Sequence, residues 1–347
     1  MIEDAKGNLL HADADALVNT VNCVGVMGKG IALQFKQAFP DMNKVYEKAC
    51  KRGEIVPGRV HVWETGSLTG PQYIINFPTK REWYTKSRYA DIESGLESLV
   101  GEIRRMHIES IAVPPLGCGN GGLAWSKVRP MIEEAFAALP GVRVLLYAPT
   151  GAPSTEDRVI RTKRPKLTRA RALFISAIDR YSVLAYRVTL LEVQKLAYFL
   201  QEAGEPLRLS YKAKRYGPYA EALNKVLETL EGHYIRGFDG ERAPSKELSL
   251  VDGAVRDADA LLSGNPDAVD RLRRMGTLIE GFETPYGMEL LSSVHYVTVH
   301  GEPRAADIDE AVDRVHAWSP RKAKTMKPQH IRLAWEHLNE HGWFDRP

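Results

Sequence analysis

Short runs rich in β-branched residues alternate with helical patterns through the first 150 residues, and this alternation restricts the fold more than any other feature. The runs predict strands at 17–22, 59–64, 73–77, 111–113 and 142–147. Helices are predicted between them, because apolar residues from Ile92 to Ile103 recur at helical spacing. Such a chain forms a three-layer α/β domain whose ligands bind in loops at the carboxyl ends of the strands.

Three helices of this domain are predicted from local signals. One covers 29–39 and ends at Pro40, a second covers 87–105, and Ser126 is predicted to cap the third. We therefore expect an α/β domain over residues 1–152, with a mixed central sheet between two layers of helices.

The second half of the 347-residue chain has a different pattern. Thr189 and Glu192 have the spacing of a capping box at the start of a helix. Further helical patterns are found at 218–231, 266–282, 307–318 and 328–341. Residues 172–347 are therefore predicted to form a second, mainly α domain.

A basic linker is predicted between the two domains, at 153–171. Residues 151–171 hold seven Lys and Arg and two acidic residues, although the whole chain has a net charge of only +3. One interpretation is a solvated connector that follows Pro and Gly turn formers. The other is a strip that contacts nucleic-acid phosphates.

The few cysteines and the histidines give little sign of metal or redox chemistry. The three cysteines form no Cys-x-x-Cys pair, and the N-terminus has no apolar signal core, so a cytoplasmic protein without membrane contact is expected. His337 and His341 have the spacing of a metal pair but no third ligand nearby, and His295 and His300 are interpreted as unpartnered. We predict no metal site and no cofactor.

Two glycine-rich loops each follow a predicted strand and lead into a predicted helix. The first lies in NTVNCVGVMGKGIALQF at 19–35, and the second in IAVPPLGCGNGGLAW at 111–125. Glycines allow close backbone approach, and free N–H groups at a helix start favour an anion such as pyrophosphate. Asn22 is suited to a ribose hydroxyl, since its amide both donates and accepts hydrogen bonds. The alternative is a pair of ordinary glycine turns.

Residues 1–152 resemble the macrodomain family, whose members bind ADP-ribose or remove it. The resemblance rests on KGNLLHADADALVNTVNCVGVMGKGIALQFKQAFP and on VPPLGCGNGG. NFPTK at 76–80, followed by the helix at 87–105, is similar to a branch that contains ADP-ribosyl glycohydrolases. This resemblance implies a macrodomain fold and a catalytic role for Lys80.

The same resemblance implies an ADP-ribose site. Asn8 and Leu9 would lie near the adenine, although many macrodomains have aspartate in place of Asn8, and Asn22 would meet the distal ribose. Backbone groups of two segments would enclose the pyrophosphate and that ribose, namely Val26, Met27, Gly28, Lys29, Gly30 and Ile31 with Gly117, Cys118, Gly119, Asn120 and Gly121.

Two positions near this site raise separate questions. Gly121 stands where a related glycohydrolase has an aspartate that resolves a lysine-linked intermediate, so a lysine–aspartate pair is incomplete here. Trp83 and Tyr84, just after Lys80, either stack on a nucleobase or anchor their loop. Lys80 itself would act as a covalent amine or as a positioned acid, and the residues alone do not choose between these.

The implied function is that of an antitoxin. The macrodomain would remove ADP-ribose from thymine bases of single-stranded DNA, and 172–347 would bind the cognate DarT-type toxin, a DNA ADP-ribosyltransferase. Residues 193–219, with KLAYF and RYGPYA, resemble the Panacea-type antitoxin domain, which implies protein binding. The alternatives are a hydrolase of ADP-ribosylated acidic protein side chains and a non-catalytic ADP-ribose-binding module.

Overall fold

The computed structural model describes the chain except residues 68, 150–153, 155–156, 185–186 and 345–347. It divides into two compact units, Met1–Lys163 and Arg164–Pro347. Each unit has its own hydrophobic core.

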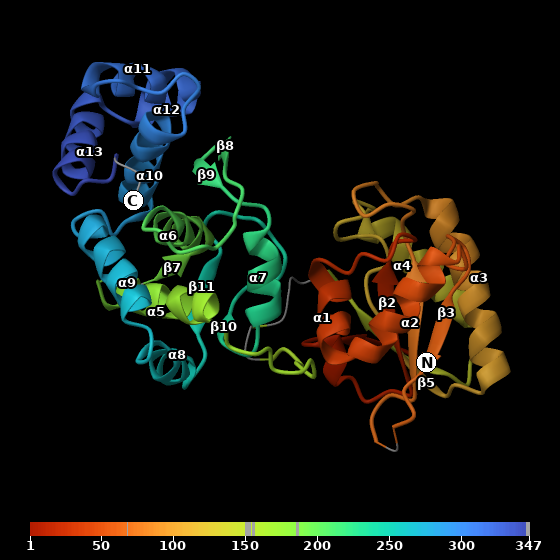
Figure 1. Cartoon of the computed structure of the whole chain (residues 1–347). Coiled ribbons are helices and arrows are strands. Elements are labelled where there is room, and N and C mark those ends of the chain that lie inside the picture. The colour runs from red at the N-terminus through yellow and green to blue at the C-terminus, as the bar shows by residue number, and fades with distance from the viewer. Residues whose placement is uncertain (68, 150–153, 155–156, 185–186, 345–347) are drawn as a thin grey trace. The chain divides into compact units, whose positions relative to one another are not determined.

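Unit 1 is built on a six-stranded sheet with the order β1-β6-β5-β2-β4-β3 (Figure 1). Its strands are β1 (Ile2–Ala5), β2 (Ala16–Val21), β3 (His61–Glu64), β4 (Tyr73–Pro78), β5 (Ser110–Val113) and β6 (Arg143–Tyr147). All neighbouring pairs are parallel except β3 and β4, which are antiparallel. The mixed sheet of the predicted fold class is therefore confirmed, and β1 is a strand that the sequence reading missed.

Helices cover both faces of this sheet. Unit 1 contains the short 3-10 helix η1 (Leu9–His11) and the helices α1 (Gly30–Ala38), α2 (Pro40–Lys51), α3 (Tyr89–Met106) and α4 (Trp125–Ala137). One core joins α3 and α4 to one face, with Ile92 and Ile132 against Ile111, while a second core joins α1 and α2 to the other face. The three layers follow from these two cores.

Two local helix predictions are wrong in detail. Pro40 does not simply end a helix; it is the first residue of α2, because its fixed φ and missing N–H suit that position. Ser126 is not the cap of α4, since the helix already begins at Trp125, with Ala124 as the N-cap residue.

Unit 2 is mainly helical, in agreement with the predicted fold class. Its helices are α5 (Arg169–Leu184), α6 (Leu190–Glu202), α7 (Leu223–Leu230), α8 (Ala254–Leu262), α9 (Pro266–Ile279), α10 (Pro285–Val299), α11 (Ile308–Trp318), α12 (Pro320–Thr325) and α13 (Pro328–Glu340). β7 (Val188–Thr189), β10 (Ile235–Arg236) and β11 (Glu247–Leu250) form a small antiparallel sheet. A separate hairpin joins β8 (Lys212–Lys214) to β9 (Gly217–Tyr219).

The segment predicted as a linker is divided between the two units. The described residues up to Lys163 belong to unit 1, where Val159 packs against the core and Arg158 is buried. The remainder belongs to unit 2, in which α5 begins at Arg169. Residues 153, 155 and 156 lie outside the described residues.

Among the described residues, no helix has both the length and the apolar composition needed to cross a membrane.

Candidate functional site: the carboxyl edge of the unit 1 sheet

The carboxyl ends of β2, β4 and β5 bring three loops to one edge of the sheet. The loops after β2 and β4 are joined by backbone bonds. The Thr79 N–H donates to Val21 O at 2.9 Å, and the Cys23 N–H donates to Arg81 O at 3.0 Å. These bonds fix the backbone on both sides of Lys80, so its side chain starts from a rigid position.

Lys80 reaches from the loop after β4 to the loop after β5. Its Nζ atom donates a hydrogen bond to the carbonyl oxygen of Asn120 at 2.5 Å. Partial burial and the nearby charge of Lys29 lower the pKa of Lys80. A lysine with a lowered pKa has a larger neutral fraction, which is the nucleophilic form of the amine.

The two glycine loops also approach each other directly. A Cβ atom at Gly30, where φ is +61°, would lie 3.3 Å from Nδ2 of Asn120. Helix α1 begins at Gly30, and the first N–H groups of a helix have no partner within the helix. The edge therefore combines Lys80, Lys29 and unpaired N–H donors of a helix start, and this combination favours a pyrophosphate.

Asn22 is engaged within its own loop. Its Nδ2 donates to Val26 O at 2.6 Å, while its Oδ1 accepts from the N–H groups of Val24 and Val26 at 3.0 and 3.2 Å. The amide thus shapes the loop, and a ribose contact would require it to exchange one of these bonds.

Helix α2 contributes a residue that sequence reasoning missed. The Tyr46 hydroxyl is fully buried and donates to Asn22 O at 2.7 Å, so α2 holds the first glycine loop from beneath. The signal that could have revealed this helix is the helical spacing of apolar residues in 39–49, with Pro40 as its first residue.

At the other end of the predicted site, Asn8 caps η1. Its Oδ1 accepts from the Leu10 N–H at 3.0 Å, and its Nδ2 donates to Asp157 O at 2.6 Å. Leu9 and Met27 have buried side chains in the core beneath. Val26 is exposed and Ile31 is partly buried, so the side chains of the predicted residues in this segment differ in their accessibility to a ligand.

The second loop has no room for a side chain at Gly121. A Cβ atom there would lie 2.2 Å from Ser87 Oγ and 2.3 Å from Gly117 O. Ser87 therefore fills the space next to the position at which the related glycohydrolase has an aspartate. Gly119 and Asn120 are exposed, whereas Cys118 is partly buried and its thiol pKa is raised by that burial, which disfavours the nucleophilic thiolate.

Trp83 and Tyr84 lie in the same loop as Lys80 and are largely exposed. Their exposed fractions are 54% and 68%, and their rings meet edge to face with centroids 5.2 Å apart. These rings are therefore accessible to a ligand, and stacking on a nucleobase stays a prediction.

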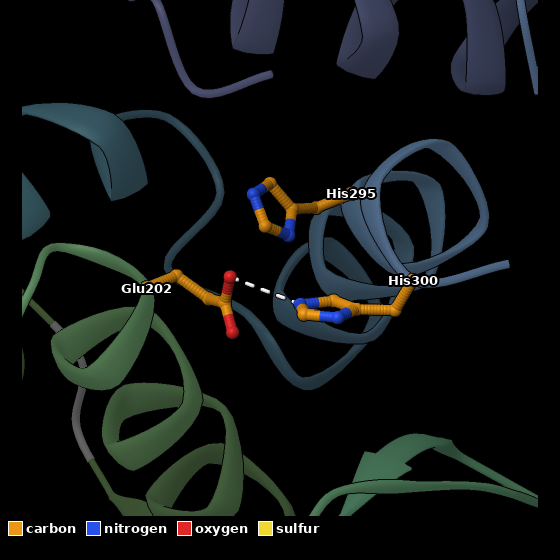
Figure 2. A group of neighbouring side chains, drawn as sticks. All are labelled: Glu202, His295 and His300. Atoms are coloured by element: carbon orange, nitrogen blue, oxygen red, sulfur yellow. Dashed lines mark ion pairs between the residues drawn. The ribbon is translucent and has the colours of Figure 1, made fainter. Parts of the chain in front are cut away.

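In unit 2, the interpretation of His295 and His300 as unpartnered is wrong. Figure 2 shows both side chains near Glu202, and His300 Nε2 lies 3.0 Å from a Glu202 oxygen. The three residues form a group of metal-ligand type, with ligand atoms within 4.8 Å of one another. However, both ring nitrogens of His295 already have partners, Tyr198 Oη at 2.7 Å and Trp343 O at 2.9 Å. A metal ion would have to displace Tyr198.

The Macro domain family model matches residues 18–132. A DNA ADP-ribosyl glycohydrolase of Thermus aquaticus is 46% identical over 353 residues, covering 100% of this chain and 97% of that protein. A DNA ADP-ribosyl transferase-DNA ADP-ribosyl glycohydrolase fusion protein of Thermosipho africanus is 36% identical over 159 residues, covering 42% of this chain and 41% of that protein. The solved macrodomain of Mycobacterium tuberculosis DarG is 56% identical with a TM-score of 0.43, covering 43% of this chain and 99% of that one.

The mixed sheet between two helical layers, with two glycine loops at its carboxyl edge, defines unit 1 as a macrodomain. This agrees with the sequence prediction. The chain as a whole belongs to the DNA ADP-ribosyl glycohydrolase family, since the Thermus aquaticus relative matches it over its full length. It is therefore a hydrolase, as the sequence predicts.

Proposed function

We propose that the chain removes ADP-ribose from thymine bases of single-stranded DNA and that Lys80 carries out the cleavage. The observation that carries this proposal is the bond from Lys80 Nζ to Asn120 O, which puts the amine between the two glycine loops. The printed activity of the full-length relatives supports the DNA substrate.

In the proposed complex, pyrophosphate binds the N–H groups at the start of α1 and the second glycine loop, close to Lys29. The distal ribose then lies beside Lys80, with backbone groups of 26–31 and 117–121 around it. The adenine lies toward Asn8 and Leu9. Trp83 and Tyr84 stack on the modified base or its neighbour, because their exposed rings follow Lys80 in the same loop.

The proposed reaction uses the neutral amine of Lys80 as a nucleophile. The amine attacks the anomeric carbon, the bond from that carbon to thymine breaks, and the base leaves with a proton. Opening of the ribose ring gives a protonated imine, which one water hydrolyses to release ADP-ribose and restore Lys80. The lowered pKa of Lys80 supports this route over one in which the ammonium protonates the leaving base.

Unit 2 is proposed to bind the cognate toxin. Its resemblance to a Panacea-type domain supports a protein-binding role. The Thermosipho africanus fusion protein, named for both a transferase and a glycohydrolase, supports a functional connection between the two activities.

One comparison of substrates tests the enzymatic proposal. The full chain is incubated with oligonucleotide ADP-ribosylated on thymine and, separately, with protein ADP-ribosylated on acidic side chains, while calorimetry measures binding of free ADP-ribose. We expect rapid release from the oligonucleotide and little from the protein. Preferential release from the protein would favour the acidic side-chain hydrolase, and binding with no release would favour the non-catalytic module.

The toxin proposal needs a separate experiment. The tagged full chain is mixed with a candidate cognate DNA ADP-ribosyltransferase, and complex formation is followed by size-exclusion chromatography. A stable complex is expected for the wild type and for Lys80→Ala, because unit 2 does not need the catalytic lysine. The absence of a complex for both proteins would remove the toxin-binding part of the account.

A further inference from the structure

Most basic residues of the segment predicted as a DNA-contacting strip already have partners. Arg164 is 2.8 Å from Asp257 and stacks on Tyr234, and Arg169 is 3.0 Å from Glu205. Arg158 is buried, Arg161 lies over the Phe39 ring, and Arg171 donates to a backbone carbonyl. Within the described residues, carboxylates therefore neutralise only part of the charge of this strip. The side chains of Lys163 and Lys166 have no ion pair there.

The β8–β9 hairpin of unit 2 also has free positive charge, gathered in a short segment without acidic residues. No acidic residue occurs between Glu205 and Glu221, and four basic residues do, Arg208, Lys212, Lys214 and Arg215. All four are exposed, and none has an ion pair with any residue that the structure describes. Lys212 and Lys214 extend from the same face of β8, because side chains alternate along a strand.

An aromatic ring, that of Tyr216, lies at the tip of this hairpin, close to two guanidinium groups. Arg321 lies 4.6 Å from the centroid of the Tyr216 ring, and Arg215 lies 5.5 Å from it. The Tyr216 side chain remains partly exposed. Positive charges next to a partly exposed aromatic ring are a combination by which proteins bind single-stranded nucleic acid.

Buried polar groups hold the hairpin in place. Lys195 of α6 is 1% exposed, and its Nζ donates to Pro218 O at 2.6 Å. The adjacent Gln194 bonds both the N–H and the carbonyl of Ala220, at 3.0 and 3.2 Å. These bonds join the two motifs that the sequence singled out, KLAYF and RYGPYA.

Burial of the charged Lys195 amine beneath the hairpin costs free energy. Burial lowers the pKa of Lys195 to about 7, which shows how unfavourable its charge is in the core. At the other end of the hairpin, Trp318 Nε1 donates to Lys214 O at 3.0 Å. A rigid exposed hairpin loses little conformational entropy on binding, so this arrangement suits a docking element.

We propose that the β8–β9 hairpin binds the sugar-phosphate backbone of single-stranded DNA, with Lys212, Lys214 and Arg215 on phosphates and Tyr216 beside a base. This inference rests on the proposed DNA substrate and gives unit 2 a role in holding it. A nucleic acid fits this surface better than a protein does, because the hairpin is rich in lysine, which is depleted at protein interfaces.

A matched pair of variants of the full chain tests the proposal. Lys212→Glu/Lys214→Glu alters the hairpin, and Lys163→Glu/Lys166→Glu makes the same charge change in the strip. Binding of a fluorescent, unmodified oligothymidine is measured by anisotropy at several salt concentrations, after circular dichroism has confirmed folding. A milder variant, Lys212→Gln/Lys214→Gln, serves if the charge reversal unfolds the hairpin.

We expect the hairpin variant to lose at least about tenfold in affinity and the salt slope of log K to fall by roughly 1.4, since two phosphate contacts are lost. The strip variant should stay within about twofold of the wild type. Equal losses in both variants, or wild-type binding by the hairpin variant, would overturn the proposal. Wild-type DNA binding with loss of toxin capture would also overturn it and would assign the hairpin to a protein partner.

The Lys80→Ala variant separates this inference from the catalytic one. It should bind the oligothymidine as the wild type does, because Lys80 is not part of the hairpin. Failure of the wild type to release ADP-ribose would sink the proposed function alone, whereas failure of the wild type to bind oligothymidine would sink the hairpin proposal alone.

Discussion

Lys80 is the residue whose chemistry depends most on its surroundings. Its backbone is held by bonds on either side, and its amine lies between the glycine loops, where burial and Lys29 lower its pKa. Without these neighbours it would be a solvated strand-end lysine, with a smaller fraction of neutral amine. The reactivity that we propose is therefore a property of the loop cluster as much as of the side chain.

The pH dependence of ADP-ribose release tests the form in which Lys80 acts. If the neutral amine is the nucleophile, the rate rises with pH and levels off above the Lys80 pKa, which lies below the usual value of 10.5. Lys29→Gln should move this rise to higher pH, because it removes a neighbouring positive charge. Single-turnover rates between pH 6 and about 10 measure both effects; a rate that falls with pH would support the acid role instead.

His295 makes the stability of unit 2 dependent on pH. Burial lowers its pKa to about 4 from 6.5, so the folded state keeps the ring neutral while the unfolded chain takes up a proton. The free energy of unfolding should therefore fall as the pH drops from about 6.5 to 4, by up to roughly 3 kcal/mol. Urea unfolding of the wild type and of His295→Gln at several pH values isolates this contribution. An identical pH slope in both proteins would contradict it.

At the scale of elements, helix α2 is the support of the first glycine loop. Tyr46→Phe removes the buried hydroxyl that donates to Asn22 O, and the carbonyl left behind costs about 1–3 kcal/mol. Because the lost hydrogen bond holds the first glycine loop, we expect weaker ADP-ribose binding together with a modest loss of stability. Calorimetric titration with ADP-ribose measures the first and urea unfolding the second. Unchanged affinity would mean that α2 does not position the loop.

The sequence predicted those elements whose signals are local. Strands β2 to β6 were found because their residues are β-branched and continuous, whereas β1 reads Ile-Glu-Asp-Ala and offers no such pattern. Helix α2 was missed because Pro40 was taken only as a stop, although proline equally starts a helix.

Contacts between distant residues were beyond the reach of these local signals. The glycine loops were predicted because glycine positions and strand ends are local, whereas Lys80 was predicted from the resemblance to the macrodomain family. The bonds of Asn22 within its own loop depend on the exact path of that loop. The contacts of Tyr46 with this loop and of His295 with Tyr198 join residues far apart in the sequence.

At the scale of the whole molecule, the net charge of +3 conceals an uneven distribution. Most basic residues of 151–171 already have contacts within the described residues, while the free cations that we emphasise lie on the hairpin of unit 2, whose residues 164–347 have a net charge of only +1. The proposed division of labour follows from this. The macrodomain recognises ADP-ribose through backbone groups and Lys80, and unit 2 supplies binding to macromolecules.

Release of ADP-ribose from thymine-modified single-stranded DNA by the wild type and by Lys80→Ala tests the central claim most directly. ADP-ribose affinity is measured on the same two preparations. We expect the rate to fall by about 10²-fold or more in the variant, with affinity changed only a few-fold, because the lysine acts on the reacting carbon and the backbone holds the ligand. Release by Lys80→Ala at the wild-type rate would contradict the account.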